Sequence, residues 1–250
     1  MVDKKVQRIK FIIAVIVVIC VGIMVFIRVN EYNKNGEKNM PFNISKIIII
    51  STAQKDESVD APTDLNSESI WNFNIIQNND IYLKIDESEG HKEKLKSVTI
   101  SNIEVVQPPQ KGILRPYMPN SLDGDRYTYT SDYTVSGSLT YRGAEESNYK
   151  NLQINQNGGV IGISFANKDL EKYSSGEDTE VTYDGKMLSK LGITDEDMKS
   201  KIAFDLIIEL DDGKSYSGRV NLDINCEGLV ENGTSQIEIS DFSNVVFKRI

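Results

Sequence analysis

The sequence contains few residues of the types that build disulfide scaffolds and metal centres. Its 250 residues include two cysteines and one histidine. Cys20 lies inside an apolar run and Cys226 in the polar remainder of the chain, so we expect no intrachain disulfide. A structural zinc site needs a tetrahedral set of Cys and His ligands, which this chain does not supply. We therefore predict no bound metal and no cofactor.

Charge is absent from residues 11–27, FIIAVIVVICVGIMVFI. As a helix, this run covers about 25 Å, the short end of what spans a hydrocarbon core. A cleavable signal peptide has a shorter apolar region followed by small residues at the cleavage site. Here the apolar run ends with residues 24–28, MVFIR, which include no small residue. We therefore predict an uncleaved transmembrane helix that contacts the lipid bilayer through residues 11–27.

This helix divides the chain into unequal parts. Residues 1–10 form a short basic tail. Residues 28–43 are polar, and their apolar residues show no helical or strand periodicity, which predicts a tether. Residues 44–250 form a β domain, or two β subdomains divided near 107–125, a region rich in proline. Lys and Arg flank the apolar run four to three in favour of the N-terminal side. The positive-inside rule then predicts a single-pass protein of the cell membrane, with a cytoplasmic N-terminus and the C-terminal domain outside.

Basic residues are outnumbered by acidic ones, 28 to 37. Five of the basic residues and one acidic residue precede Glu31. The remainder therefore carries 23 basic and 36 acidic residues, a net charge of −13. Affinity for nucleic acid comes chiefly from Lys and Arg that neutralise phosphates. We therefore exclude nucleic acid as a partner.

Short apolar or alternating segments separated by turn residues fill the chain after residue 44. This pattern predicts a mainly β fold, an antiparallel β-sandwich or barrel-like ectodomain with one short helix. Residues 47–50 are four consecutive isoleucines, typical of a strand covered on both faces. Asn78-Asn79-Asp80 suits the turn of a short hairpin between strands at 70–77 and 81–85.

Three local patterns give sharper expectations. Residues 202–210 and 216–224 alternate strictly around the turn at 211–214, which predicts a hairpin. Thr194 followed by three acidic residues predicts a helix start with a capping box. The alternation at 98–105 slips by one residue near Ser101-Asn102, which predicts a bulge. Residues 237–242 show the same slip, and we interpret both segments as strands that bend between sheets; the last strand is expected over 236–247.

No catalytic constellation is visible. His91 lies among charged residues in a predicted loop, where a solvated side chain is the simpler interpretation. Glycosidases need two carboxylates at a defined separation, but some pair of so many acids meets it by chance. Asp123-Gly-Asp125 and Asp211-Asp212-Gly213 resemble fragments of calcium loops without the full spacing. We therefore predict no catalytic residue.

Tyrosines cluster between residues 117 and 149. Tyr117, Tyr127, Tyr129 and Tyr133 are the candidate ligand-binding residues, because Tyr127 and Tyr129 share one face of a predicted strand and can form a platform for a sugar or peptide. The alternative is structural, since tyrosine favours strands and the rims of sheets.

Two functions fit these features. The preferred one is a membrane-anchored extracytoplasmic domain that binds, scaffolds or assembles an envelope protein or polysaccharide at the cell surface. The alternative is a membrane-tethered enzyme that uses carboxylates to act on envelope polysaccharide.

Overall fold

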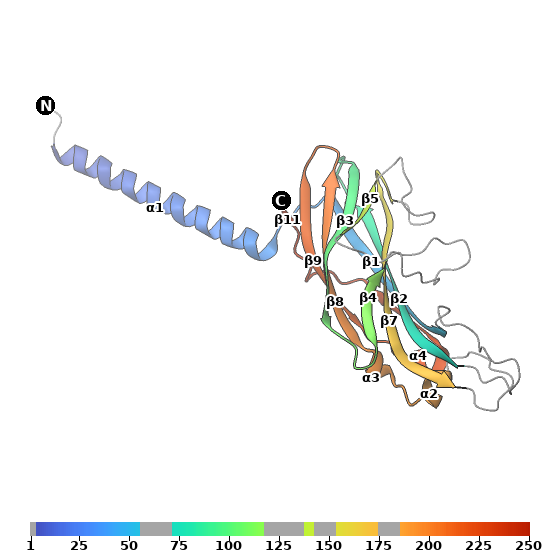
Figure 1. Cartoon of the computed structure of the whole chain (residues 1–250). Helices are drawn as coiled ribbons and strands as arrows, with labels where there is room; N and C mark the ends of the chain where they lie inside the picture. The colour runs from blue at the N-terminus through green and yellow to red at the C-terminus, as the bar shows by residue number, and fades with distance from the viewer. Residues whose placement is uncertain (1–3, 56–71, 118–137, 143–153, 175–185) are drawn as a thin grey trace, which may run out of the picture.

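The computed structural model describes residues 4–55, 72–117, 138–142, 154–174 and 186–250. One long helix, α1 (Lys4–Asn35), projects from a body built of strands (Figure 1). Among the described residues, α1 is the one helix long and apolar enough to cross a membrane, and its apolar window is not buried by the protein. It includes the predicted run at 11–27 and can anchor the chain in a bilayer.

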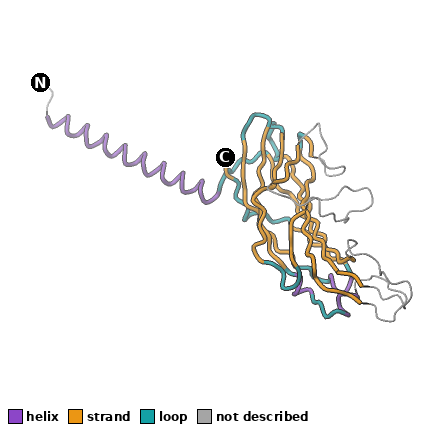
Figure 2. Tube along the Cα trace, in the orientation of Figure 1, coloured by secondary structure: helices purple, strands orange, loops and turns teal. Residues whose placement is uncertain are grey.

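The strands form two antiparallel sheets, so the mainly β prediction is confirmed. The six-stranded sheet has the order β10-β1-β2-β7-β4, with β6 paired to β7, and the other has the order β11-β9-β8-β3-β5. The first contains β1 (Phe42–Lys55), β2 (Asn72–Glu87), β4 (Ile113–Tyr117), β6 (Ile154–Asn155), β7 (Gly158–Ser174) and β10 (Thr234–Ile239). The second contains β3 (Leu95–Gln107), β5 (Ser138–Arg142), β8 (Ser200–Leu210), β9 (Ser215–Ile224) and β11 (Lys248–Arg249). The short helices α2 (Lys186–Lys190), α3 (Asp195–Met198) and α4 (Leu229–Asn232) gather at the end of the body far from α1 (Figure 2).

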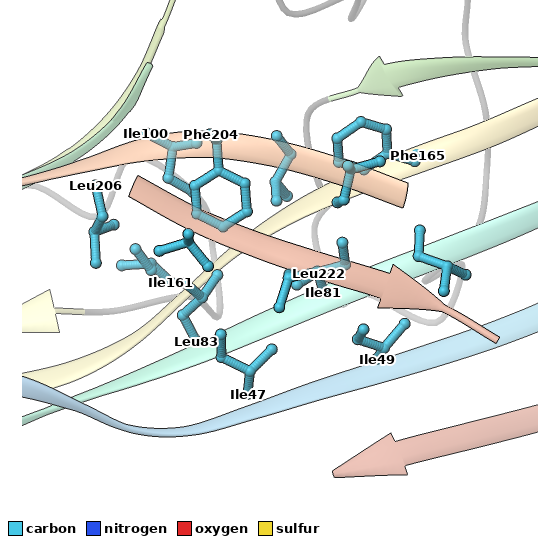
Figure 3. Packing of buried hydrophobic residues seen from close by; sticks show 14 of the residues in the cluster. Ile47, Ile49, Ile81, Leu83, Ile100, Ile161, Phe165, Phe204, Leu206 and Leu222 are labelled. Carbon is cyan, nitrogen blue, oxygen red and sulfur yellow. The ribbon is translucent and has the colours of Figure 1, made fainter. Parts of the chain in front are cut away.

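One hydrophobic cluster draws side chains from both sheets. Figure 3 shows Ile47, Ile81, Leu83 and Ile161 of the six-stranded sheet on one side, and Phe204, Leu206 and Leu222 of the other sheet opposite them. The cluster takes residues from both sides of the division predicted near 107–125. The two sheets therefore share one core.

The predicted hairpin is confirmed as β8 and β9. Ile202 pairs with Leu222 and Ile208 with Tyr216, and the turn closes through a hydrogen bond from the Gly213 N–H to the Leu210 carbonyl. The inward residues Ile202, Phe204, Leu206, Ile208 and Leu210 are all buried.

The predicted bulge and helix cap are also present. The register of β3 against β8 shifts between Ser101 and Glu104, and Asn102 adopts a positive φ of 48°. Thr194 accepts a hydrogen bond from the Asp197 N–H, while the Asp197 carboxylate accepts one from the Thr194 N–H, which completes the capping box of α3.

Three segments differ from expectation. Asn78-Asn79-Asp80 is not a turn: β2 runs through it without interruption, and all three residues are buried. The last strand does not extend over 236–247, because β10 ends at Ile239 and the chain crosses to the other sheet as β11. Residues 28–35, part of the predicted tether, continue α1, so only residues 36–41 separate the helix from β1.

Candidate functional site

The tyrosine platform is described only at Tyr117. This side chain is 7% exposed on β4, which gives it little surface for a ligand. Tyr127, Tyr129 and Tyr133 lie outside the described residues. His91 lies in the loop between β2 and β3, with Nδ1 3.3 Å from a carboxylate oxygen of Glu93.

Several carboxylates on the surface are held by basic neighbours. Arg219 contacts Glu104 at 2.6 Å and Asp205 at 3.2 Å, and it donates to the Asn102 carbonyl at the β3 bulge. Glu209 accepts hydrogen bonds from Lys96 and Ser97, which hold the pKa of its carboxyl below the usual range. Within the described residues, no group of three or more His, Cys, Asp or Glu side chains is arranged to hold a metal ion.

A polar cluster lies inside the core, where sequence reasoning placed none. It consists of Ser51 on β1, Gln77 and Asn79 on β2, Asn167 on β7, and Cys226 just after β9. Each of these residues is at most 1% exposed. Gln77 and Asn79 have the same parity in β2 as Ile81, Leu83 and Ile85. Side chains in a strand alternate between faces, so the uninterrupted strand carries amides into an otherwise aliphatic interior.

Hydrogen bonds connect the whole polar cluster. Asn79 Oδ1 accepts from Ser51 Oγ at 2.7 Å and from Gln77 Nε2 at 2.9 Å. Asn167 Nδ2 donates to Gln77 Oε1 at 3.2 Å and to the Lys111 carbonyl at 3.0 Å. Gln77 Nε2 also lies 2.8 Å from Cys226 Sγ. These bonds compensate for the desolvation that buried amides would otherwise suffer.

Cys226 is fixed in an unusual backbone conformation. Its φ of 55° lies in the left-handed region. That region costs an L-residue about 1–2 kcal/mol. The carboxylate of Asp195 accepts hydrogen bonds from the N–H groups of Gly228 and Val230 just downstream and so stabilises this turn. Burial raises the pKa of the Cys226 thiol to about 12, so the thiol is protonated at neutral pH.

The second notable feature is the junction between α1 and the β body. The Gly36 N–H donates to the Tyr32 carbonyl, and the Glu37 N–H donates to the Phe247 carbonyl at 2.8 Å. The Tyr32 hydroxyl accepts a hydrogen bond from the Arg249 N–H at 2.9 Å. The last turn of α1 is therefore bonded to the segment that leads into β11.

Gly36 makes this close approach possible. Its φ is +67°, and a Cβ at this position would lie 2.2 Å from the Phe247 carbonyl oxygen and 2.7 Å from Val246 Cγ1. Gly36 and the neighbouring Met40 and Phe42 are buried. Gly36, Met40 and Pro41 are thus packed against the β body, whereas Lys38 and Asn39 are exposed.

Comparison with known proteins gives no relative. No family model matches the chain, and no curated protein or solved structure is detectably similar to it.

Proposed function

We propose that this chain is a single-pass membrane protein whose extracytoplasmic antiparallel β-sandwich binds or scaffolds an envelope protein or polysaccharide at the cell surface. The flanking charges support a cytoplasmic N-terminus and a domain outside. The 23 basic and 36 acidic residues after residue 30 give a net charge of −13. A domain with this charge is repelled by anionic lipid headgroups, which favours a solvated domain that does not lie on the membrane surface.

The observation that carries this proposal is the junction. Because α1 continues to Asn35 and its last turn is bonded to the β11 segment, the domain is held close to the membrane in a restricted orientation. A domain with restricted orientation loses less rotational freedom when it binds a partner in the same envelope, so more of its contact energy appears as affinity.

The segment joining β3 and β4 is the surface offered to such a partner. Val106 and Ile113 flank the turn at 107–112, and their exposed fractions are 52% and 50%. Among the large aliphatic residues of the described β body, only Ile250 is more exposed. The Lys111 N–H donates to the Asp197 carbonyl, which fixes this turn against α3 at the end of the body far from α1 (Figure 1). An apolar spot on a rigid turn that points away from the membrane suits contact with an envelope component.

Site-specific photo-crosslinking in cells tests the proposal. A photoreactive residue at position 106 or 113 should give a discrete adduct with an envelope protein or polysaccharide. The matched controls are Asn221 and Asp223, which are exposed on β9 of the same domain and should give none. Equal labelling from all four positions, or no adduct from any, would contradict a binding role at this surface. An adduct with a cytoplasmic protein would contradict the orientation.

A further inference from the structure

The length of the apolar run determines the level at which the junction stands above the membrane core. Residues 11–27 cover about 25 Å as a helix, whereas the hydrocarbon core is about 30 Å thick. The core therefore also takes in flanking residues, up to Val29 on the side of the β body. Tyr32 follows about 4.5 Å beyond Val29. The headgroup layer on each side of the core is about 5–7 Å thick, so this turn of α1 lies within it.

The junction brings the segment that leads into β11 to the same level. The Arg249 N–H donates to the Tyr32 hydroxyl at 2.9 Å, and Lys248 is the residue before Arg249. Figure 1 shows the end of the chain beside the end of α1. Arg28 precedes Tyr32 by four residues and so lies on the same face of α1. Arg28, Lys248 and Arg249 therefore gather at the headgroup layer, and we call these three residues the basic corner.

The basic corner differs from the sheets in how its charges are paired. On the sheets, cations contact carboxylates of neighbouring strands or residues: Lys46, Lys84, Lys96, Lys201 and Arg219. Among the residues that the structure describes, no carboxylate lies within ion-pair distance of a residue of the basic corner. The charges of the basic corner are thus left for a ligand outside the chain.

Acidic side chains near the basic corner are already bound by other cations. Glu31 and Asp212 are close enough to be affected by the charges of Arg28 and Arg249. Glu31 contacts Lys38 at 2.8 Å, and Asp212 contacts Lys214 at 2.6 Å. These two carboxylates therefore do not neutralise the basic corner.

We propose that the basic corner binds the phosphate groups of anionic lipids in the membrane that α1 crosses. A guanidinium group binds phosphate oxygens through paired hydrogen bonds, and an ammonium group binds them as a point charge. The junction already holds the basic corner at the headgroup layer, so little further ordering opposes the contact. The rest of the β body is acidic and is repelled by the same lipids.

This contact gives the β body a second attachment to the membrane beside α1. Attraction at one corner and repulsion elsewhere fix the tilt of the domain against the bilayer. The inference rests on the membrane anchoring in the proposed function, but it does not depend on a partner at the turn at 107–112.

Fluorescence quenching of the full-length protein in nanodiscs tests the lipid contact. Cys20→Ser removes the exposed cysteine, and Cys226 is buried. Ser217→Cys, at the residue paired with Lys248, then takes a bimane label. The discs consist of phosphatidylcholine with a nitroxide quencher on one of two headgroups, anionic N-acylated phosphatidylethanolamine or zwitterionic phosphatidylcholine. Half-maximal quenching should need about fivefold less of the anionic quencher for each basic residue in contact, the usual effect of one Lys or Arg at an anionic surface.

Paired variants separate the basic corner from charge in general. Lys248→Gln with Arg249→Gln should remove most of the difference between the two quenchers. Lys172→Gln with Lys190→Gln is the matched control and should leave the difference unchanged, because the end of β7 and α2 lie far from α1 (Figure 1). Equal quenching by both lipids in the labelled protein, or quenching by neither, would overturn the proposal without any further variant. A chain that does not insert into the discs would refute the anchoring itself, and the lipid contact with it.

Discussion

The junction between α1 and the β body can be broken by adding one methyl group. In Gly36→Ala, the new Cβ would lie 2.2 Å from the Phe247 carbonyl oxygen, so the segment at 246–249 must move away. The hydrogen bonds from the Glu37 N–H and to the Tyr32 hydroxyl are then lost. Each contributes about 0.5–1.5 kcal/mol net, which gives about 2 kcal/mol for the pair.

Alanine at this position also carries a backbone cost. An L-residue in the left-handed region is disfavoured by about 1–2 kcal/mol, so the total loss in Gly36→Ala is about 3–4 kcal/mol. Gly213→Ala is the matched control. Gly213 has a φ of +83°, but a Cβ there would meet nothing within 4 Å. We expect it to lose the backbone contribution alone, about 1–2 kcal/mol.

Hydrogen exchange and urea denaturation of the full-length protein in nanodiscs measure the difference. The Glu37 and Arg249 amides should exchange about 30-fold faster in Gly36→Ala, since about 1.4 kcal/mol corresponds to a factor of ten. Gly213→Ala should leave both amides protected. If the two variants lose equal stability and the Glu37 amide stays protected in both, the junction is not held by these contacts and the reasoning fails.

Two further predictions concern the core and the helix cap. Phe204 is fully buried, whereas Lys201 is exposed on the same strand, β8. Phe204→Ala should lower the free energy of unfolding by about 3–5 kcal/mol, because it deletes a buried aromatic ring. Lys201→Ala should change that free energy by about 0.5 kcal/mol at most. Similar losses in urea denaturation would contradict the β8–β9 packing. The backbone N–H and hydroxyl of Thr194 hold the pKa of Asp197 below its usual range. A carboxyl with a lowered pKa stabilises the fold at neutral pH, and this contribution is lost as the pH falls below about 4. Asp197→Ala should therefore lower the free energy of unfolding by about 0.5–1 kcal/mol at pH 7 and by much less near pH 3, where the native carboxyl is largely protonated, and an equal loss at both pH values would argue against the capping box.

Sequence patterns predicted those parts of the fold that are determined by residues close together in the chain. The hairpin of β8 and β9 alternates without a slip, and Thr194 with Asp197 forms a cap that needs only four residues. The bulge at Ser101-Asn102 could be predicted because the apolar–polar alternation shifts there by one residue. Without a bulge, such a shift would move the apolar side chains to the other face of the sheet.

The polar cluster could not be predicted in the same way. Asn78-Asn79-Asp80 has the composition of a turn, and only pairing with β1 and β7 on both sides keeps it extended. A signal was present, because Gln77 and Asn79 have the same parity as Ile75, Ile81 and Leu83. The contact between Gln77 and Cys226 spans 149 residues, and no local pattern encodes it.

Residues 28–35 were misjudged for another reason. Their helix continues the apolar run without interruption, and the Tyr32 hydroxyl within it accepts a hydrogen bond from the Arg249 N–H. The first of these is a neighbour in the sequence, but the second lies at the other end of the chain. A polar composition without period therefore looked like a tether.

The hydrogen bond between Tyr32 and Arg249 has a consequence for the order of folding. Its two ends are separated by 217 residues, the longest span of any side-chain hydrogen bond described for the chain. Closing so long a loop before the intervening strands have formed is entropically unfavourable. The bond therefore forms after the sheets have brought the segment at 246–249 back to α1. Until then α1 can rotate about its own axis independently of the growing β body, and only a completely folded β body arrests that rotation.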